Sequence, residues 1–195
     1  MIGEIASFTN ALANAFTNTL GGKSTQQSSW RNTLRASTTI AFALICVVIA
    51  FDLSSLTLRV VLIGLLAGFS GGLGLPFIYH AFSVGSVSFV GPVVALVQSF
   101  NLIAFAVIVK NEQIAPLFPI AACLGASGLY LCSRQVGGNK KATLNAFFLT
   151  AAAGTLFSGF SFIMTLIESN EILPALFGAR IGVLLISVIF APKSD

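Results

Sequence analysis

Amide and hydroxyl side chains recur at helical spacing near the N-terminus of the 195-residue chain, at Ser7, Asn10, Asn14, Thr17 and Asn18. Intervals of three and four residues place side chains on one face of a helix. Burying an amide without a hydrogen-bond partner costs about 2 to 7 kcal/mol, so this polar face must contact protein or water. Two explanations stay open: the amides bond to neighbouring helices, or they line a polar path for a solute.

Two further segments carry polar side chains that could belong to the same path. Gln98 and Asn101 lie in the apolar segment 87–109, where packing between helices is the competing explanation. Ser158 belongs to a face of hydroxyls in segment 144–167, and Tyr79 fits an interfacial anchor as well as a pathway residue. We predict that the pathway is lined by this set: Asn10, Asn14, Asn18, Tyr79, Gln98, Asn101 and Ser158.

Catalytic chemistry has no comparable candidate in the sequence. The acidic residues all lie at the ends of apolar segments or between them: Glu4, Asp52, Glu112, Glu168, Glu171 and Asp195. A nucleophile with a base and an orienting acid is not discernible, and there is a single histidine. The three cysteines lack metal-ligand spacing. We therefore expect no enzyme activity, no metal site and no cofactor.

The composition indicates where these side chains must work. Hydrophobic residues make up 56% of the chain, charged residues 8%, and the mean hydropathy is +0.95. Soluble domains are about 25% charged. Residues 60–109 contain no Asp, Glu, Lys or Arg. These values exclude a soluble enzyme, a nucleic-acid-binding module and a disordered regulator, and predict a multi-pass protein of the cell membrane whose first partner is the lipid bilayer.

A helix of about 20 apolar residues crosses the hydrocarbon core. Segments of that kind predict an all-α bundle of about seven membrane helices: 2–20, 33–51, 58–82, 87–109, 114–132, 144–167 and 173–190. Gly64, Gly68 and Gly72 recur every four residues and predict a seam where two helix backbones approach closely. Pro76 and Pro92 remove backbone donors inside two of the spans, which is tolerated next to protein or a cavity.

The two ends of the chain share a weak internal similarity. An offset of 145 residues places Arg180 on Arg35, and each arginine is expected to begin an apolar span that follows a more polar one. Five spans would separate the two copies, so the second would lie upside down in the membrane. Such inverted-topology repeats are typical of secondary transporters.

The segment from Tyr79 to Pro92 has a tyrosine-x-alanine pattern, a short turn, small residues and a proline. In this it resembles the drug/metabolite transporter superfamily, EamA type. Arg35 and Glu112 are similar to that family's arginine at the start of the second helix and its glutamate before the fifth. The resemblance implies a five-helix repeat over 2–133, a polar linker over 134–143 and two helices of a second repeat over 144–191. The family usually has ten spans, so the second repeat would be incomplete.

The resemblance implies a permease that moves a small polar or amphipathic metabolite across the membrane. The alternative is a chain that does not transport alone, either a truncated remnant or a half-transporter subunit. In that case the missing helices would be replaced by a second copy or a partner half-transporter, packed through Gly64, Gly68 and Gly72. Neutral amides and hydroxyls favour a polar or zwitterionic solute.

Membrane orientation gives two opposite expectations. Seven basic residues fall on the side opposite the N-terminus and three on its own side, Arg59, Lys110 and Arg180. Basic residues favour the cytoplasmic side, so this bias places the N-terminus outside. The family resemblance implies a cytoplasmic N-terminus.

Overall fold

The computed structural model describes residues 2–51, 56–113, 116, 118–134 and 140–190, with backbone only in parts of α1, α5 and the start of α6. Every element in these ranges is helical, which confirms the predicted all-α class. In chain order the elements are α1 (Ile2–Gln27), α2 (Trp30–Ile49), α3 (Leu58–Val84), α4 (Val87–Lys110), α5 (Phe118–Arg134), α6 (Lys140–Met164), the 3₁₀ segment η2 (Ser169–Glu171) and α7 (Ile172–Phe190).

Among the described residues, five helical segments are long and apolar enough to cross a membrane. They are Trp30–Ile49, Leu58–Val84, Val87–Lys110, Leu144–Met164 and Ser169–Phe190. They confirm spanning-length apolar helices at five of the seven predicted positions. α5 has 17 residues, and α1 carries the polar stripe, so membrane crossing by these two helices stays a prediction.

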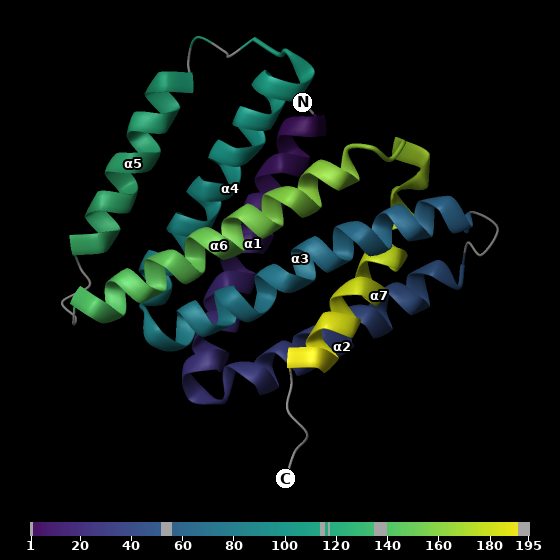
Figure 1. The fold of residues 1–195 in the computed structure, drawn as a ribbon, viewed down its shortest axis with the longest axis horizontal. Helices are drawn as coiled ribbons and strands as arrows, with labels where there is room; N and C mark the ends of the chain where they lie inside the picture. The colour runs from purple at the N-terminus through teal and green to yellow at the C-terminus, as the bar shows by residue number, and fades with distance from the viewer. Residues whose placement is uncertain (1, 52–55, 114–115, 117, 135–139, 191–195) are drawn as a thin grey trace.

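α3 is the central helix of the bundle. Its most extensive contacts are with α7 and α6, and it also packs against α1, α2 and α4. α5 lies at the edge of the bundle and packs against α4 (Figure 1). The two helices of the predicted second repeat, α6 and α7, thus lie directly on the third helix of the first. Residues 135–139 of the predicted linker lie outside the described residues, and the division into two units stays a prediction.

The glycine seam of α3 is filled from within the same chain. A Cβ at Gly64 or Gly68 would run into the backbone carbonyl of Ala175 or Ala179 on α7. The approach is mutual, since a Cβ at Gly178 would meet the carbonyl of Val61. The predicted close backbone approach is present, but its use as a seam between two copies of the chain is wrong, because α7 already occupies that face of α3.

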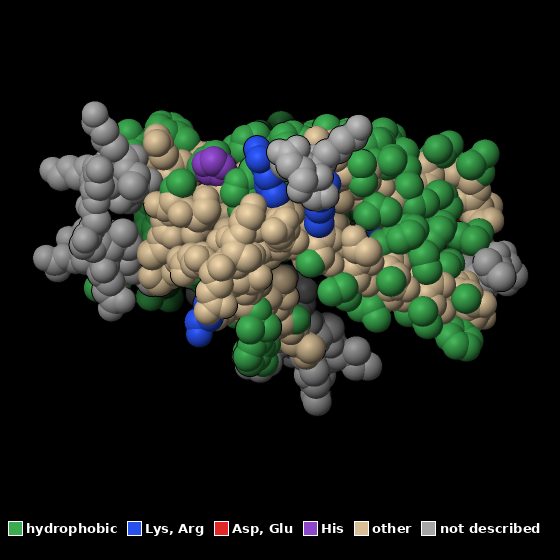
Figure 2. Space-filling model, turned by 90° about the horizontal axis from the view of Figure 1, so that it is seen from below, with side chains coloured by type: hydrophobic (Ala, Val, Ile, Leu, Met, Phe, Trp, Pro, Cys, Tyr) green, Lys and Arg blue, Asp and Glu red, His purple; other side chains and the backbone are tan. Residues whose placement is uncertain are grey.

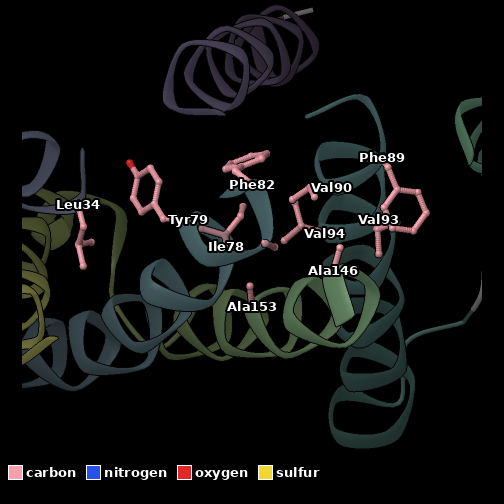
Figure 3. Packing of buried hydrophobic residues seen from close by; sticks show 11 residues of the cluster. Leu34, Ile78, Tyr79, Phe82, Phe89, Val90, Val93, Val94, Ala146 and Ala153 are labelled. Atoms are coloured by element: carbon pink, nitrogen blue, oxygen red, sulfur yellow. The ribbon is translucent and has the colours of Figure 1, made fainter. Parts of the chain in front are cut away.

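A hydrophobic cluster at the α3–α4 turn joins four helices. Ile78, Tyr79 and Phe82 of α3 pack with Val90 of α4, and Ala153 of α6 lies beneath them (Figure 3). Large apolar side chains are exposed on the outside of the bundle, where Figure 2 shows them covering much of one face. A bilayer would shield these side chains from water, as expected for a membrane protein.

Candidate cavity at the centre of the bundle

A cavity of about 540 Å³ lies between α1, α3, α4, α6 and α7. Small residues leave room for it, because Gly71, Ala95 and Ala179 contribute to its walls from three different helices. Ligand sites in proteins commonly measure about 300 to 1,000 Å³. The polar residues at its surface are Thr17, Asn18, Tyr79, Gln98, Ser161 and Arg180.

The remaining walls are mostly apolar and partly aromatic. Phe157 and Phe160 of α6 line the cavity together with Leu75 and Phe82 of α3. Gly71 and Gly74 let these aromatic rings come close, since a Cβ at Gly71 would lie 3.2 Å from the ring of Phe160. The cavity therefore combines a large apolar surface with a few polar groups, as small-molecule sites usually do.

The structure brings three of the predicted pathway residues together at this cavity: Asn18, Tyr79 and Gln98. Tyr79 is 8% exposed, and its hydroxyl donates to Ser37 Oγ of α2 at 3.1 Å. It therefore lies inside the bundle. The Gln98 Nε2 donates to Ser161 Oγ of α6 at 3.2 Å, so this amide both joins two helices and faces the cavity.

Asn101 and Ser158 are not among the described residues that line the cavity. Asn101 Nδ2 donates to Thr155 Oγ1 at 3.2 Å, so it joins α4 to α6. Ser158 is buried, and its hydroxyl donates to the backbone carbonyl of Thr155 in its own helix at 2.6 Å. The side chains of Asn10 and Asn14 lie outside the described residues.

Arg35, Pro92 and Glu112, which contribute to the family resemblance, are not among the described residues that line the cavity. Arg35 is half-buried on α2, and Pro92 is half-buried within α4, which continues through it. Glu112 is exposed just beyond α4. Asn111 ends that helix in a left-handed conformation with φ of 54°, and the backbone N–H of Glu112 then donates to the Ala106 carbonyl at 3.1 Å. This is a common way to end a helix.

Three polar cavity residues are absent from the predicted pathway set: Thr17, Ser161 and Arg180. Ser161 lies on the predicted hydroxyl face, one helical turn from Ser158. Arg180 was expected at the beginning of a span, which is wrong: it lies near the midpoint of the 19-residue α7. A lone basic residue well inside the apolar segment 173–190 was the signal that could have identified it.

No group of three or more His, Cys, Asp or Glu side chains that could hold a metal ion occurs in the part of the chain that the structure describes. The acidic side chains described there, Glu112, Glu168 and Glu171, lie after α4 or in the segment before α7. The described residues of the cavity walls thus supply amide, hydroxyl and guanidinium groups, and none of them is a carboxylate.

Comparison with protein-family models, with curated proteins and with solved structures gave no match. The function is therefore argued from the cavity itself.

Proposed function

We propose that the protein is a membrane permease of the EamA, drug/metabolite-transporter type that moves a small polar or amphipathic metabolite. The observation that carries the proposal is the cavity of about 540 Å³ between five helices, with polar groups supplied by each of α1, α3, α4, α6 and α7. A site of this kind at the junction of several helices is where bundle proteins bind small ligands. Secondary transporters place such a site near the bilayer midplane, where two halves of the protein meet.

Transport would require the two sets of helices around this site to move against each other, although α6 and α7 pack closely on α3. α6 and α7, which belong to the predicted second repeat, supply one wall, whereas α1, α3 and α4 supply the other. Rocking of α6 and α7 against the first group would expose the cavity alternately to the two sides of the membrane. The hydrogen bond between Gln98 and Ser161 crosses this boundary. Exchange of that bond for one to a solute would couple binding to the movement.

The alternative function is that of a half-transporter subunit or a chain that does not transport alone. Both functions are tested by solute uptake into liposomes that contain the purified chain. The solutes are a labelled panel of neutral, zwitterionic, anionic and cationic metabolites. Uptake of at least one of them above protein-free liposomes is expected.

A variant that fills the cavity makes this test specific. Ala95 of α4 lines the cavity and is exposed, so Ala95→Trp should occupy the space with little effect on the core. Ala104→Trp is the matched control, because Ala104 is exposed on the same helix and is not a cavity residue. We expect Ala95→Trp to reduce uptake at least tenfold and Ala104→Trp to leave it within about twofold. Folded protein without uptake of any solute would favour the alternative.

A further inference from the structure

Arg180 is a permanent cation in the middle of a helix that is apolar enough to cross a membrane. It lies on α7 within the spanning segment Ser169–Phe190 and lines the central cavity. Placing an arginine at the centre of a membrane helix is unfavourable, and such residues usually mark a functional site. Arginine keeps its charge in proteins, so it cannot lower this cost by releasing its proton.

No residue in the described part of the chain supplies a counter-charge for this guanidinium. Within the described residues, Arg180 has neither an ion pair nor a hydrogen bond from its side chain, and its side chain is exposed. None of the described residues that line the cavity is acidic. The described glutamates, Glu112, Glu168 and Glu171, lie outside the cavity walls. The described side chains that line the cavity thus carry a net positive charge, which would attract an anion.

The side chains near Arg180 in the cavity walls also indicate which uncharged parts a ligand should have. Gln98 and Ser161 offer neutral hydrogen-bonding groups within the same cavity, and Phe157 and Phe160 offer aromatic surface. The guanidinium presents two parallel N–H donors that match the two oxygens of a carboxylate, phosphate or sulfonate. A ligand that satisfies all of these groups has an anionic head and an apolar or aromatic body.

We propose that the cavity binds a small organic anion with an apolar body, and that Arg180 pairs with its anionic head. This proposal rests on the proposed permease function and names its substrate class, which differs from the zwitterionic solute that the sequence favours. Gln98 and Ser161 orient the head group, while Phe157 and Phe160 contact the body. The anionic head belongs to a water-soluble metabolite in this proposal. The competing ligand is the head group of an anionic lipid.

The test is ligand binding by the full chain in nanodiscs of phosphatidylcholine, measured by isothermal titration calorimetry. The probes share one aromatic ring and differ in charge: benzoate, benzenesulfonate and phenyl phosphate against benzyl alcohol and benzylamine. We expect the three anions to bind at least tenfold more tightly than the neutral and cationic probes. Equal binding of benzyl alcohol and benzoate by the unmodified chain would overturn the proposal without any variant.

Two variants assign the preference to Arg180. Arg180→Gln should weaken benzoate binding by about tenfold to a hundredfold, as expected for the loss of a charge-assisted hydrogen bond, and should leave benzyl alcohol binding within about twofold. Arg180→Lys should keep part of the preference, because it retains the charge without the paired donors. Arg59→Gln is the matched control, since Arg59 is exposed in the first turn of α3 and is not a cavity residue. An unchanged anion preference in folded Arg180→Gln would refute the assignment.

Nanodiscs that also contain phosphatidylglycerol separate the two anion sources. Benzoate affinity that is the same in both bilayers supports a soluble anion. Phosphatidylglycerol that stabilises the chain through Arg180, with no benzoate binding in either bilayer, overturns the proposal in favour of a lipid head group. Benzoate binding without uptake into liposomes would contradict the permease function and leave the anion site standing. Uptake of neutral solutes alone would support the permease function and contradict the anion site.

Discussion

At the scale of single residues, substitutions of Gln98 and Asn101 distinguish helix packing from solute recognition. Both are amides of α4 that donate to a hydroxyl of α6, to Ser161 and Thr155 respectively, but only Gln98 lines the cavity. Hydrogen bonds between membrane helices contribute about 0.6 kcal/mol on average and up to about 1.7 kcal/mol. We expect Gln98→Leu and Asn101→Leu to lower the free energy of unfolding by similar amounts in this range, measured by denaturation in mixed micelles.

Solute uptake should respond to only one of these two substitutions. Gln98→Leu should reduce uptake by about tenfold, which corresponds to loss of one hydrogen bond to the solute. Asn101→Leu should leave uptake within about twofold. A parallel loss of uptake in both variants would mean that Gln98 acts through packing, as Asn101 does.

The sequence predicted part of this residue-scale site. Amides and a tyrosine in apolar segments require partners, and for this reason Asn18, Tyr79 and Gln98 could be named as candidates. The sequence could not show which of Ser158 and Ser161 lines the cavity. The two residues lie about one helical turn apart on the same face, and the contacts of α6 with α3 and α4 determine which of them faces the cavity. The offset that pairs Arg180 with Arg35 predicts the start of a helix, whereas the position of Arg180 within the apolar segment 173–190 indicates the middle of one.

At the scale of elements, the contact between α3 and α7 should depend on glycine more than any other contact described here. Gly68→Ala places a methyl group against the carbonyl of Ala179, which belongs to the backbone and cannot rotate away. Overpacking of this kind costs about 1 to 3 kcal/mol. We expect Gly68→Ala to lower the free energy of unfolding by that amount, with a matching fall in the thermal unfolding midpoint in detergent.

Gly128→Ala is the control for this substitution. Gly128 is exposed on α5, and a Cβ there would meet no atom within 4 Å. Replacing a helical glycine with alanine under these conditions should be neutral or stabilising by up to about 1 kcal/mol. If both variants had equal stability, α3 and α7 would not be in the close contact described.

Helix positions and the small-residue seam could be predicted from apolar length and four-residue spacing, because these properties are local. The partner of the seam could not, since Gly64 and Gly68 would fit any helix with small residues. Ala175, Gly178 and Ala179 supply them within the same chain, a match that becomes visible only when α7 is placed on α3. A second copy of the chain is therefore not needed to cover this face.

At the scale of the whole molecule, the helix ends separate into two groups. Figure 1 shows the end of α1 with the start of α2, and the end of α3 with the start of α4, at the lower left. The start of α3 and the segment between α6 and α7 lie at the right. The described charges also differ between the groups. Lys23, Arg31 and Arg35 lie at the first, whereas Arg59, Glu168 and Glu171 lie at the second. The basic residues favour a cytoplasmic location for the first group, which places the N-terminus outside. The family resemblance implies the opposite orientation.

Cysteine labelling from the two sides of a sealed membrane tests this arrangement in a chain whose native Cys46, Cys123 and Cys132 are replaced by serine. Ser28→Cys and Ser83→Cys should label from one side, because both residues are exposed in the first group of helix ends. Gln113→Cys and Asn170→Cys should label from the opposite side.

This pattern requires α4 to cross the membrane between Ser83 and Gln113, and an odd number of helices to cross between Gln113 and Ser28. Labelling of Ser28→Cys and Ser83→Cys from opposite sides would show that α2 and α3 do not cross as a pair, which would contradict the bundle. The side that labels Ser28→Cys decides between the orientation favoured by charge and the one implied by the family resemblance.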